Sequence, residues 1–220
     1  MCNDYRQEVE LASIIEDFDD LEINIETPEG LPEDNPRADI RMTDVAPIVR
    51  AVHRPPGNYR AVGELINRRW SWPGKKGPVY NFRTEGFGGR PPDLSVNRCL
   101  VLCDGFYEFT DPVVPRPKDK RLDKWLFTMK DHKWFCMAGI WRNDPKVGEA
   151  FTLLTMDAGD DIRPYHDRQI IPLTRDQWAD WLNPEVPAED VLKYLPTGTL
   201  TVSQVWPPPA DAPEQPALGL

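Results

Sequence analysis

The chain has 220 residues, which is enough for one large domain or two small ones around a sizeable core. It is 40% hydrophobic and carries eight Trp residues, a composition typical of a folded protein and not of a disordered one. No apolar run approaches the ~18 residues that span a bilayer, and the first ten residues lack the apolar stretch of a signal peptide. We therefore expect no membrane segment and a cytoplasmic protein.

The net charge of -10 argues at first sight against nucleic acid as a partner, but the charge is unevenly distributed. Residues 8–39 hold 12 acidic residues and one Arg. Residues 41–90 hold ten basic residues against three acidic ones; the basic residues are Arg41, Arg50, Arg54, Arg60, Arg68, Arg69, Lys75, Lys76, Arg83 and Arg90. Such a basic segment is typical of a protein that binds a phosphate backbone, although a solvated surface gives the same pattern.

The first third of the chain predicts one helix and several irregular connections. Residues 7–19 place apolar side chains along one helical face with acidic residues opposite, which predicts a helix with a buried side. A Pro-rich acidic loop is expected at 27–39, followed by an extended segment at 41–52 that Pro47 interrupts. Turn-forming residues predict a turn at 54–57 and a loop at 72–78.

The remainder is mainly strand until two helices near the end. Strands are predicted at 99–103, 106–109, 151–156 and 170–173, and the segments 124–129 and 134–141 are predicted to form a hairpin around 130–133. Thr174 and Gln177 have the spacing of a capping box that starts a helix, and a second short helix is expected at 187–195. Residues 2–205 are therefore predicted to form one α+β domain, and the Pro/Ala-rich residues 206–220 a disordered tail.

Cys2 directly follows the initiator methionine. A small second residue permits removal of Met1, which would leave an α-amine of pKa near ~7.7–8 and a thiol of pKa near ~8.5 on adjacent carbons. An aldehyde can condense with the amine to a Schiff base that the thiol then closes to a thiazolidine, whereas an acyl substrate could be attacked by the thiol. Cys2 could equally be an inert residue of an unstructured terminus. Cys99 and Cys103 lack a second pair at zinc spacing, so we predict apolar strand residues and no metal site.

Three short motifs contain side chains suited to chemistry. Asn81 and Arg83 are two positions apart, so in a strand both lie on one face, where Arg83 could hold a phosphate. Glu108 follows a turn and lies between aromatic residues, where desolvation would raise its pKa toward neutrality. His166 precedes an apolar run and could transfer a proton, with Arg168 beside it as a phosphate or loop contact. Each motif alone is also compatible with a purely structural role.

A loop rich in aromatic and basic residues precedes the Asn81 motif in the sequence. Trp70 and Trp72 could stack on unpaired bases, and Lys75 and Lys76 could contact phosphates. The competing interpretation is that both tryptophans belong to the core.

Taken together, these residues resemble the SRAP family (SOS response-associated peptidase), whose members shield abasic sites in DNA. Four motifs occur in the family's order: Met1-Cys2, Asn81-Phe82-Arg83-Thr84-Glu85, Gly105-Phe106-Tyr107-Glu108-Phe109 and His166-Asp167-Arg168. Any one of them is common, but all four in order, with Cys at position 2, form a specific signal. The resemblance covers roughly residues 2–205 and implies a central, mainly antiparallel β core or barrel flanked by helices.

The resemblance also implies a function and a site. The implied partner is single-stranded DNA with abasic sites, to which the Cys2 amine and thiol would crosslink, with no cofactor and with autoprocessing of Met1. The implied catalytic residues are Cys2, Asn81, Glu108 and His166, and the implied DNA contacts are Arg83, Arg168, Trp70, Trp72, Lys75 and Lys76. A monomer associated with the cytoplasmic nucleoid is expected.

The chain departs from the family pattern at several positions. Asp4 stands where a basic residue is expected near DNA, and Phe82 replaces Ala. The usual Trp-Gly-Leu-x-Pro-x-Trp segment is reduced to Trp70-Ser71-Trp72-Pro73. These differences indicate a divergent member with altered DNA contacts.

Two other functional classes fit parts of the pattern. An N-terminal-nucleophile hydrolase or glutamine amidotransferase also exposes Cys after Met1, but the Gly-rich glutamine pocket of those enzymes is not evident here. A non-catalytic single-strand binder would use only the Arg and Trp residues and leave Cys2 inert.

Overall fold

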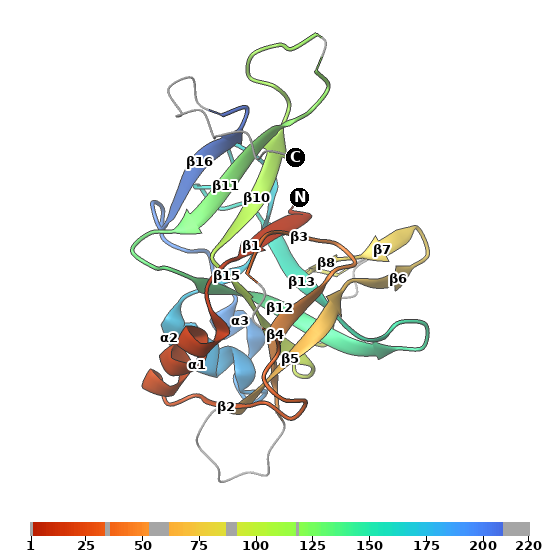
Figure 1. Ribbon diagram of the computed structural model, residues 1–220, viewed down its shortest axis with the longest axis vertical. Helices are drawn as coiled ribbons and strands as arrows, with labels where there is room; N and C mark the ends of the chain where they lie inside the picture. The colour runs from red at the N-terminus through yellow and green to blue at the C-terminus, as the bar shows by residue number, and fades with distance from the viewer. Residues whose placement is uncertain (1, 34–35, 53–61, 87–91, 118, 209–220) are drawn as a thin grey trace, which may run out of the picture.

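A computed structural model describes residues 2–33, 36–52, 62–86, 92–117 and 119–208. Its architecture is α+β and strand-rich, as the sequence predicts, with two sheets that share a core and helices on one side (Figure 1).

The larger sheet closes on itself into a barrel. Its neighbouring strands are β13 (Gly148–Asp157), β12 (Phe135–Asp144), β9 (Arg98–Cys103), β4 (Val45–Ala51) and β5 (Val62–Trp70). A parallel pairing of β13 with β5, at Ala150 with Arg69 and Phe151 with Trp70, joins the two ends. Short strands extend this ring: β2 (Asn24–Glu26), β8 (Asn81–Arg83), β14 (Arg168–Ile170) and β15 (Pro172–Leu173).

The second sheet is antiparallel and covers one end of the barrel. Its order is β16 (Leu200–Trp206), β11 (Asp123–Met129), β10 (Gly105–Thr110), β1 (Asp4–Gln7) and β3 (Arg37–Arg41). A separate hairpin of β6 (Trp72–Gly74) and β7 (Gly77–Val79) projects from the side of the molecule (Figure 1).

Strand β9 is buried on both faces, which explains its uninterrupted apolar sequence from Cys99 to Cys103. In β9, Cys99, Val101 and Cys103 face an inner cluster and the alternate residues Leu100 and Leu102 face an outer cluster. The inner cluster lies within the barrel and beneath the second sheet, and includes Cys2, Tyr5, Ile48, Ile66, Trp70, Val101, Phe106, Phe127, Met137, Phe151 and Leu153. The outer cluster lies beneath the helices and includes Leu11, Phe18, Val49, Leu65, Leu100, Leu102, Ala138, Leu154, Trp178 and Trp181.

Three helices cover the outer face of the barrel: α1 (Leu11–Asp20), α2 (Arg175–Leu182) and α3 (Ala188–Val191). The predicted capping box of Thr174 and Gln177 is present at the start of α2. Helix α1 begins four residues later than predicted because residues 4–7 pair with β10 and β3 as β1. Within the described ranges, no helix has the length and apolar composition that crossing a membrane requires.

Several local predictions were wrong. Segments 124–129 and 134–141 do not form a hairpin, because β11 pairs with β10 and β16 whereas β12 pairs with β9, β13 and β15. Pro47 does not interrupt β4: pairing with β9 covers only Ile48–Arg50, so no partner on that side requires the N–H that Pro47 lacks. The loop at 72–78 is the β6–β7 hairpin, and β3 begins inside the loop predicted at 27–39.

The strands that were not anticipated from the sequence include β1, β2, β3, β5 and β16. In β5 the pattern is obscured by Arg68, whose charge is compensated by Glu29 and Glu149. The predicted turn at 54–57 and most of the predicted tail lie outside the described residues. The limits of the domain at 2–205 stay a prediction.

Candidate functional site

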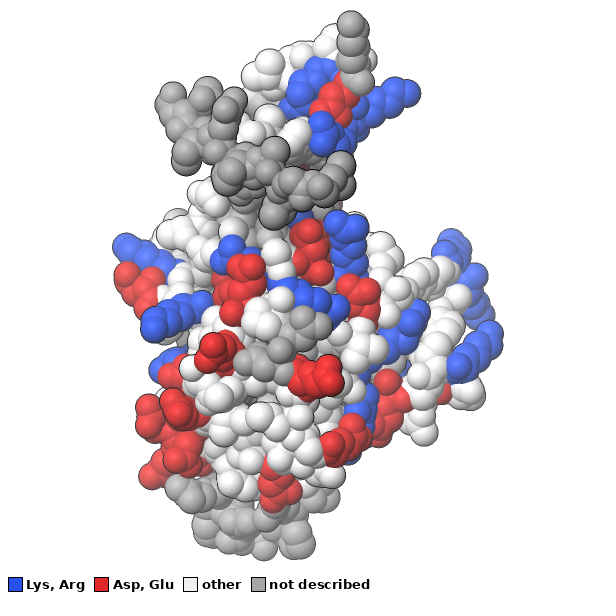
Figure 2. Space-filling model, in the orientation of Figure 1, with Lys and Arg blue, Asp and Glu red and all other residues white. Residues whose placement is uncertain are grey.

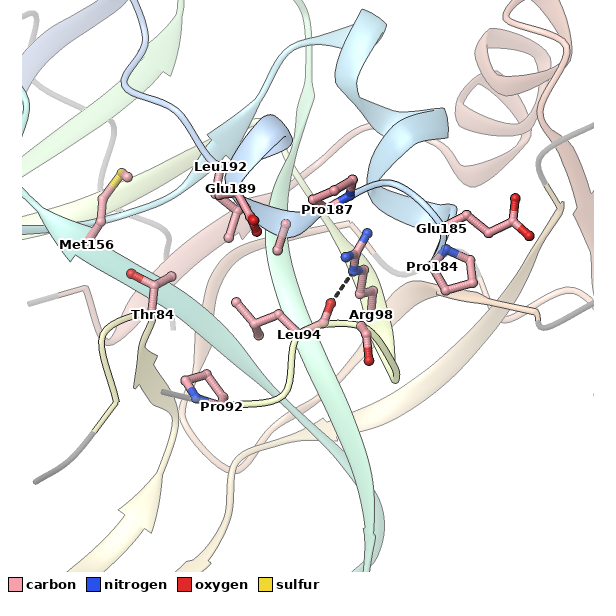
Figure 3. Close-up of a pocket in the computed structure, with 12 residues that line it drawn as sticks. Thr84, Pro92, Leu94, Arg98, Met156, Pro184, Glu185, Pro187, Glu189 and Leu192 are labelled. Carbon is pink, nitrogen blue, oxygen red and sulfur yellow. Dashed lines mark hydrogen bonds between the residues drawn. The ribbon is translucent and has the colours of Figure 1, made fainter. Parts of the chain in front are cut away.

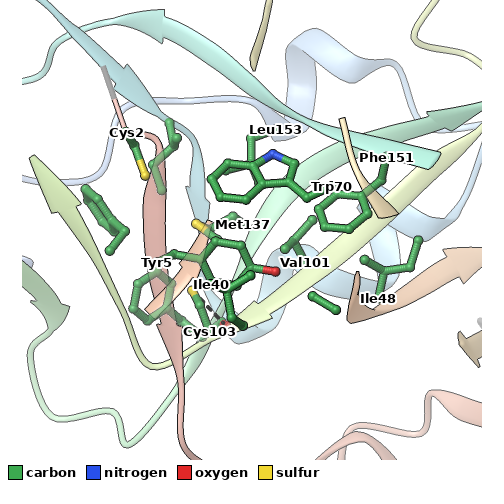
Figure 4. Packing of buried hydrophobic residues seen from close by; sticks show 14 of the residues in the cluster. Cys2, Tyr5, Ile40, Ile48, Trp70, Val101, Cys103, Met137, Phe151 and Leu153 are labelled. Carbon is green, nitrogen blue, oxygen red and sulfur yellow. Dashed lines mark hydrogen bonds between the residues drawn. The ribbon is translucent and has the colours of Figure 1, made fainter. Parts of the chain in front are cut away.

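Cys2 lies two residues before β1, and its side chain is fully buried at one margin of the inner cluster (Figure 4). Its thiol donates a hydrogen bond to the carbonyl oxygen of Asp4 at 3.3 Å. Burial raises the pKa of the thiol, and the charge of Glu108 raises it further. The resting thiol is therefore protonated near neutral pH, and a nucleophilic step requires a proton acceptor beside it.

Asn81 reaches Cys2 from the barrel. It is the first residue of β8, which is held parallel to β13 with Asn81 opposite Leu153. The Asn81 side-chain N–H donates to the carbonyl oxygen of Cys2 at 2.7 Å. The Asn81 Oδ1 atom is buried without a hydrogen-bond partner among the described residues, so it remains available as an acceptor.

Glu108 reaches Cys2 from the second sheet. It lies in β10, the neighbour of β1, and is fully buried. Burial raises the pKa of Glu108 to about 6, and the backbone N–H of Cys2 opposes this shift by bonding to the carboxylate. The carboxyl group can thus both accept and donate a proton within about one pH unit of neutrality.

His166 lies in the turn that leads into β14. Its Nδ1 accepts the backbone N–H of Arg168 at 2.9 Å, which leaves the proton of the neutral ring on Nε2. Burial lowers the pKa of His166, while Asp167, whose Oδ1 lies 2.8 Å from Nδ1, opposes that change. The charge of Asp167 also raises the pKa of Glu108, so this turn lies close enough to act on that carboxyl group. Cys2, Asn81, Glu108 and this turn are together called the Cys2 pocket.

The structure gives Arg168 a role different from the predicted phosphate contact. Its guanidinium is buried and forms ion pairs with Glu85 and Asp157, as well as a hydrogen bond to the Thr155 carbonyl oxygen at 3.1 Å. These contacts join β8, β13 and β14. Arg168 therefore holds the His166 turn in place and does not present a free cation.

The predicted stacking role of Trp70 and Trp72 was also wrong. Trp70 is fully buried in the inner cluster and donates its indole N–H to the Tyr80 carbonyl oxygen at 2.8 Å. Trp72 is only 4% exposed and lies beneath the Arg142 guanidinium. Neither ring offers a face to a base, because the short Trp-Ser-Trp-Pro segment folds both into the interior.

The basic segment contributes fewer available cations than its composition suggests. Arg50 and Arg68 are ion-paired with acidic neighbours, namely Glu64 and Glu149 for Arg50 and Glu29 and Glu149 for Arg68. Arg54, Arg60 and Arg90 lie outside the described residues. Lys75 and Lys76 are exposed at the tip of the β6–β7 hairpin and Arg83 is exposed on β8.

The two charge blocks are only partly separated in space (Figure 2). Glu29 of the acidic block pairs with Arg68 of the basic block at 2.6 Å. Acidic side chains gather over α1, whereas Lys and Arg gather on the projecting edge that includes the β6–β7 hairpin. Asp4, at the position where a basic residue was expected, is buried in an ion pair with Lys124 at 2.7 Å. Lys124 also pairs with Asp39 at 2.6 Å, so this group carries no excess positive charge.

A cavity of about 550 Å³ lies elsewhere, between the 92–98 loop and the α2–α3 connection (Figure 3). The buried Arg98 guanidinium borders it and donates to carbonyl oxygens of residues 94, 183 and 186. The lining contains none of the four predicted catalytic residues, so the cavity is separate from the Cys2 pocket.

Cys2, Asn81, Glu108 and the His166 turn, far apart in the sequence, thus converge. The family model of SOS response-associated peptidase (SRAP) matches residues 1–207. The chain belongs to the SRAP family.

Curated relatives of this SRAP chain are distant. Abasic site processing protein YoqW from Bacillus subtilis (strain 168) is 24% identical over 196 residues, 83% of this chain and 84% of YoqW. Abasic site processing protein HMCES from Gallus gallus is 31% identical over 125 residues, 47% of this chain and 37% of HMCES.

Solved structures share the fold of this chain. A phage-related protein from Bordetella bronchiseptica matches with a TM-score of 0.68 and 19% identity over 93% of this chain and 94% of its own. A protein from Bacteroides thetaiotaomicron matches with a TM-score of 0.64 and 18% identity over 92% and 91%. At these identities the likeness concerns the fold alone.

Proposed function

We propose that this protein binds single-stranded DNA and crosslinks covalently to abasic sites through Cys2. The observation that carries the proposal is the placement of both ends of the Cys2 backbone. Its nitrogen faces the buried Glu108 carboxylate, and its carbonyl oxygen accepts the Asn81 amide. The relatives YoqW and HMCES are named as abasic site processing proteins, which supports the same substrate.

Removal of Met1 would convert the Cys2 nitrogen into an α-amine beside Glu108. The amine attacks the aldehyde carbon of the ring-opened deoxyribose, and Glu108 takes the proton that the nitrogen loses. The protonated Glu108 returns that proton to the former carbonyl oxygen, which becomes a hydroxyl. Transfer of the second nitrogen proton through Glu108 to this hydroxyl then releases water and forms the Schiff base. The thiol adds across the C=N bond, its sulfur to carbon and its proton to nitrogen, and closes the thiazolidine. One water is released overall.

Neighbouring residues assist this sequence. The free Asn81 Oδ1 accepts a hydrogen bond from the amine or from a sugar hydroxyl and orients it. The Nε2–H of neutral His166 donates toward the ring oxygen as the sugar opens. The same nucleophile and acid–base pair would serve autoprocessing of Met1, which we propose as a secondary activity.

The DNA strand is proposed to follow Arg83 and the exposed Lys75 and Lys76. A single strand is the favoured substrate because an intact duplex hides the sugar aldehyde. We retain a monomer in the cytoplasmic nucleoid as the predicted state and location.

The test uses single-stranded DNA with one abasic site and a denaturing gel. The wild type should give a heat-stable shifted band that is absent in Cys2→Ala. Because Cys2→Ala keeps an α-amine, borohydride should restore its band by reducing the Schiff base. Mass spectrometry of the wild type should show that Met1 is absent.

Other outcomes would identify the alternative functions. DNA binding without any covalent band, with or without borohydride, would indicate the passive single-strand binder. Glutaminase activity without DNA binding would indicate the amidotransferase.

A further inference from the structure

Three aromatic side chains adjoin the Cys2 pocket, each next to one of its polar residues in the sequence or across a strand pair. They are Tyr80, which precedes Asn81, Trp125, which is opposite Glu108 in the β10–β11 register, and Tyr165, which precedes His166. All three are partly exposed and pack against the inner cluster that contains Cys2. The two tryptophans of the 70–72 segment, in contrast, are buried.

Trp125 and Tyr165 form a braced pair. Their ring centroids are 4.9 Å apart at an interplanar angle of 60°. The Trp125 indole N–H donates to Thr110 Oγ1 at 2.9 Å, and the Tyr165 ring packs edge-on against Phe127 at 5.2 Å. Both rings are therefore held from behind, and a second base-sized ring could contact the remaining exposed surface without reorganisation of the pair.

Tyr80 is held in a different way. Its carbonyl oxygen accepts the Trp70 indole N–H, and its ring meets Trp70 edge-on with centroids 6.1 Å apart. Burial raises the pKa of the Tyr80 phenol, as do the nearby Cys2 and Glu108, which agrees with a ring close to both groups. Trp70 thus supports an exposed aromatic residue instead of being one.

We propose that Tyr80, Trp125 and Tyr165 form an aromatic collar that stacks on the intact bases flanking the abasic site. An abasic residue interrupts base stacking, so the neighbouring bases present free faces that need new partners. The collar offers one stacking position beside Asn81 and another beside Glu108 and His166. Stacking tolerates any base identity, so the substrate class is an abasic residue with a base on each side, in any sequence. This inference rests on the proposed crosslinking function.

The test compares two single-stranded oligonucleotides of equal length and charge. Both carry one central abasic aldehyde; in the first its neighbours are adenines, and in the second they are tetrahydrofuran residues that lack bases. Stacking contributes about 1–3 kcal/mol, or about 5- to 150-fold, for each of the two flanking bases, so the wild type should crosslink the first at least about 5-fold faster at subsaturating protein. Trp125→Leu and Tyr165→Leu should each lower that ratio, because each disrupts the stacking position beside Glu108 and His166, and should leave the part that the Tyr80 position contributes.

Two controls separate stacking from folding. Trp141→Leu removes another partly exposed Trp of the inner cluster, opposite Phe151, and should keep the wild-type ratio. Trp125→Phe keeps an aromatic face and should retain part of the ratio even though the Thr110 hydrogen bond is lost.

The inference is overturned if the wild type crosslinks both oligonucleotides equally, or if both Leu variants keep the preference. If neither oligonucleotide is crosslinked, the result would instead contradict the proposed function. In that case, binding of the same two oligonucleotides would be measured by fluorescence anisotropy. Tighter binding to the first would support a stacking surface, and equal binding would exclude it.

Discussion

At the scale of single residues, the pocket combines a protonated thiol with a carboxyl group whose pKa lies near 6. Both properties result from burial, which disfavours the charged form of each group. Neither can be derived from the sequence spacing of Cys2 and Glu108. The desolvation penalty of an ionised carboxylate in the interior makes Glu108 a proton acceptor near neutral pH. The same penalty lowers the stability of the folded state by a measurable amount.

Glu108→Gln should therefore stabilise the fold while it slows crosslinking. The folded-state pKa of Glu108, about 6, lies above the ordinary value of 4.5, so the folded state binds the extra proton. Stability consequently falls as pH rises from below 4.5 to above 6, by on the order of 2 kcal/mol. Denaturant titrations at pH 4 and pH 8 should show the variant more stable than wild type only at pH 8.

The crosslinking rate of the wild type should rise with pH through about 6 as Glu108 ionises, and Glu108→Gln should lack this limb. A variant that crosslinks at the wild-type rate across this range would show that Glu108 is not the proton acceptor.

At the scale of elements, the short strands β8 and β14 carry the site because β13 holds both. Arg168 completes this arrangement through Glu85, two residues after β8, and Asp157 at the end of β13. The His-Asp-Arg motif could be recognised in the sequence, but a motif does not say whether its Arg faces solvent or spans three strands. The parallel pairing of β8 with β13 brings Glu85 within reach of Arg168, and this pairing joins residues more than 70 positions apart in the sequence.

Arg168→Gln should destabilise the protein by about 1–3 kcal/mol, because hydrogen bonds to charged groups are lost from a buried position. The salt dependence of DNA binding should not change, since the guanidinium does not contact phosphate. Chemical denaturation and binding titrations at several salt concentrations would measure both effects. A shallower salt dependence with unchanged stability would restore the phosphate role to Arg168.

The β6–β7 hairpin should supply phosphate contacts through its tip. Each phosphate contact on a single strand contributes about -0.7 to the slope of log K against log salt. The double variant Lys75→Gln/Lys76→Gln should therefore reduce the magnitude of that slope by about 1.4. Lys130→Gln/Lys133→Gln, which removes two exposed charges from the β11–β12 turn, is the matched control and should leave the slope unchanged.

At the scale of the whole molecule, sequence patterns predicted the fold class, the strands such as β9 that are apolar on both faces, and the start of α2. Each of these depends on local periodicity or on helix capping. They failed for β5, where paired Arg68 interrupts the apolar pattern, and for the 124–141 segment, where proximity in sequence imitates a hairpin. The four polar residues of the pocket were identified as motifs. The aromatic collar was not, because Tyr80, Trp125 and Tyr165 are related only through the packing of the two sheets.

The two core clusters should differ in how they connect stability to activity. Phe127 and Phe18 are both fully buried, but Phe127 belongs to the inner cluster and contacts Tyr165, whereas Phe18 packs on Trp134 and Trp178 in the outer cluster. Phe127→Leu and Phe18→Leu should each lower the free energy of unfolding by about 1–3 kcal/mol. Crosslinking rates measured well below the melting temperature should fall only for Phe127→Leu, because the cavity forms beneath the pocket. An equal reduction of the crosslinking rate in both variants would mean that changes in the outer cluster reach the site as strongly as changes in the inner cluster.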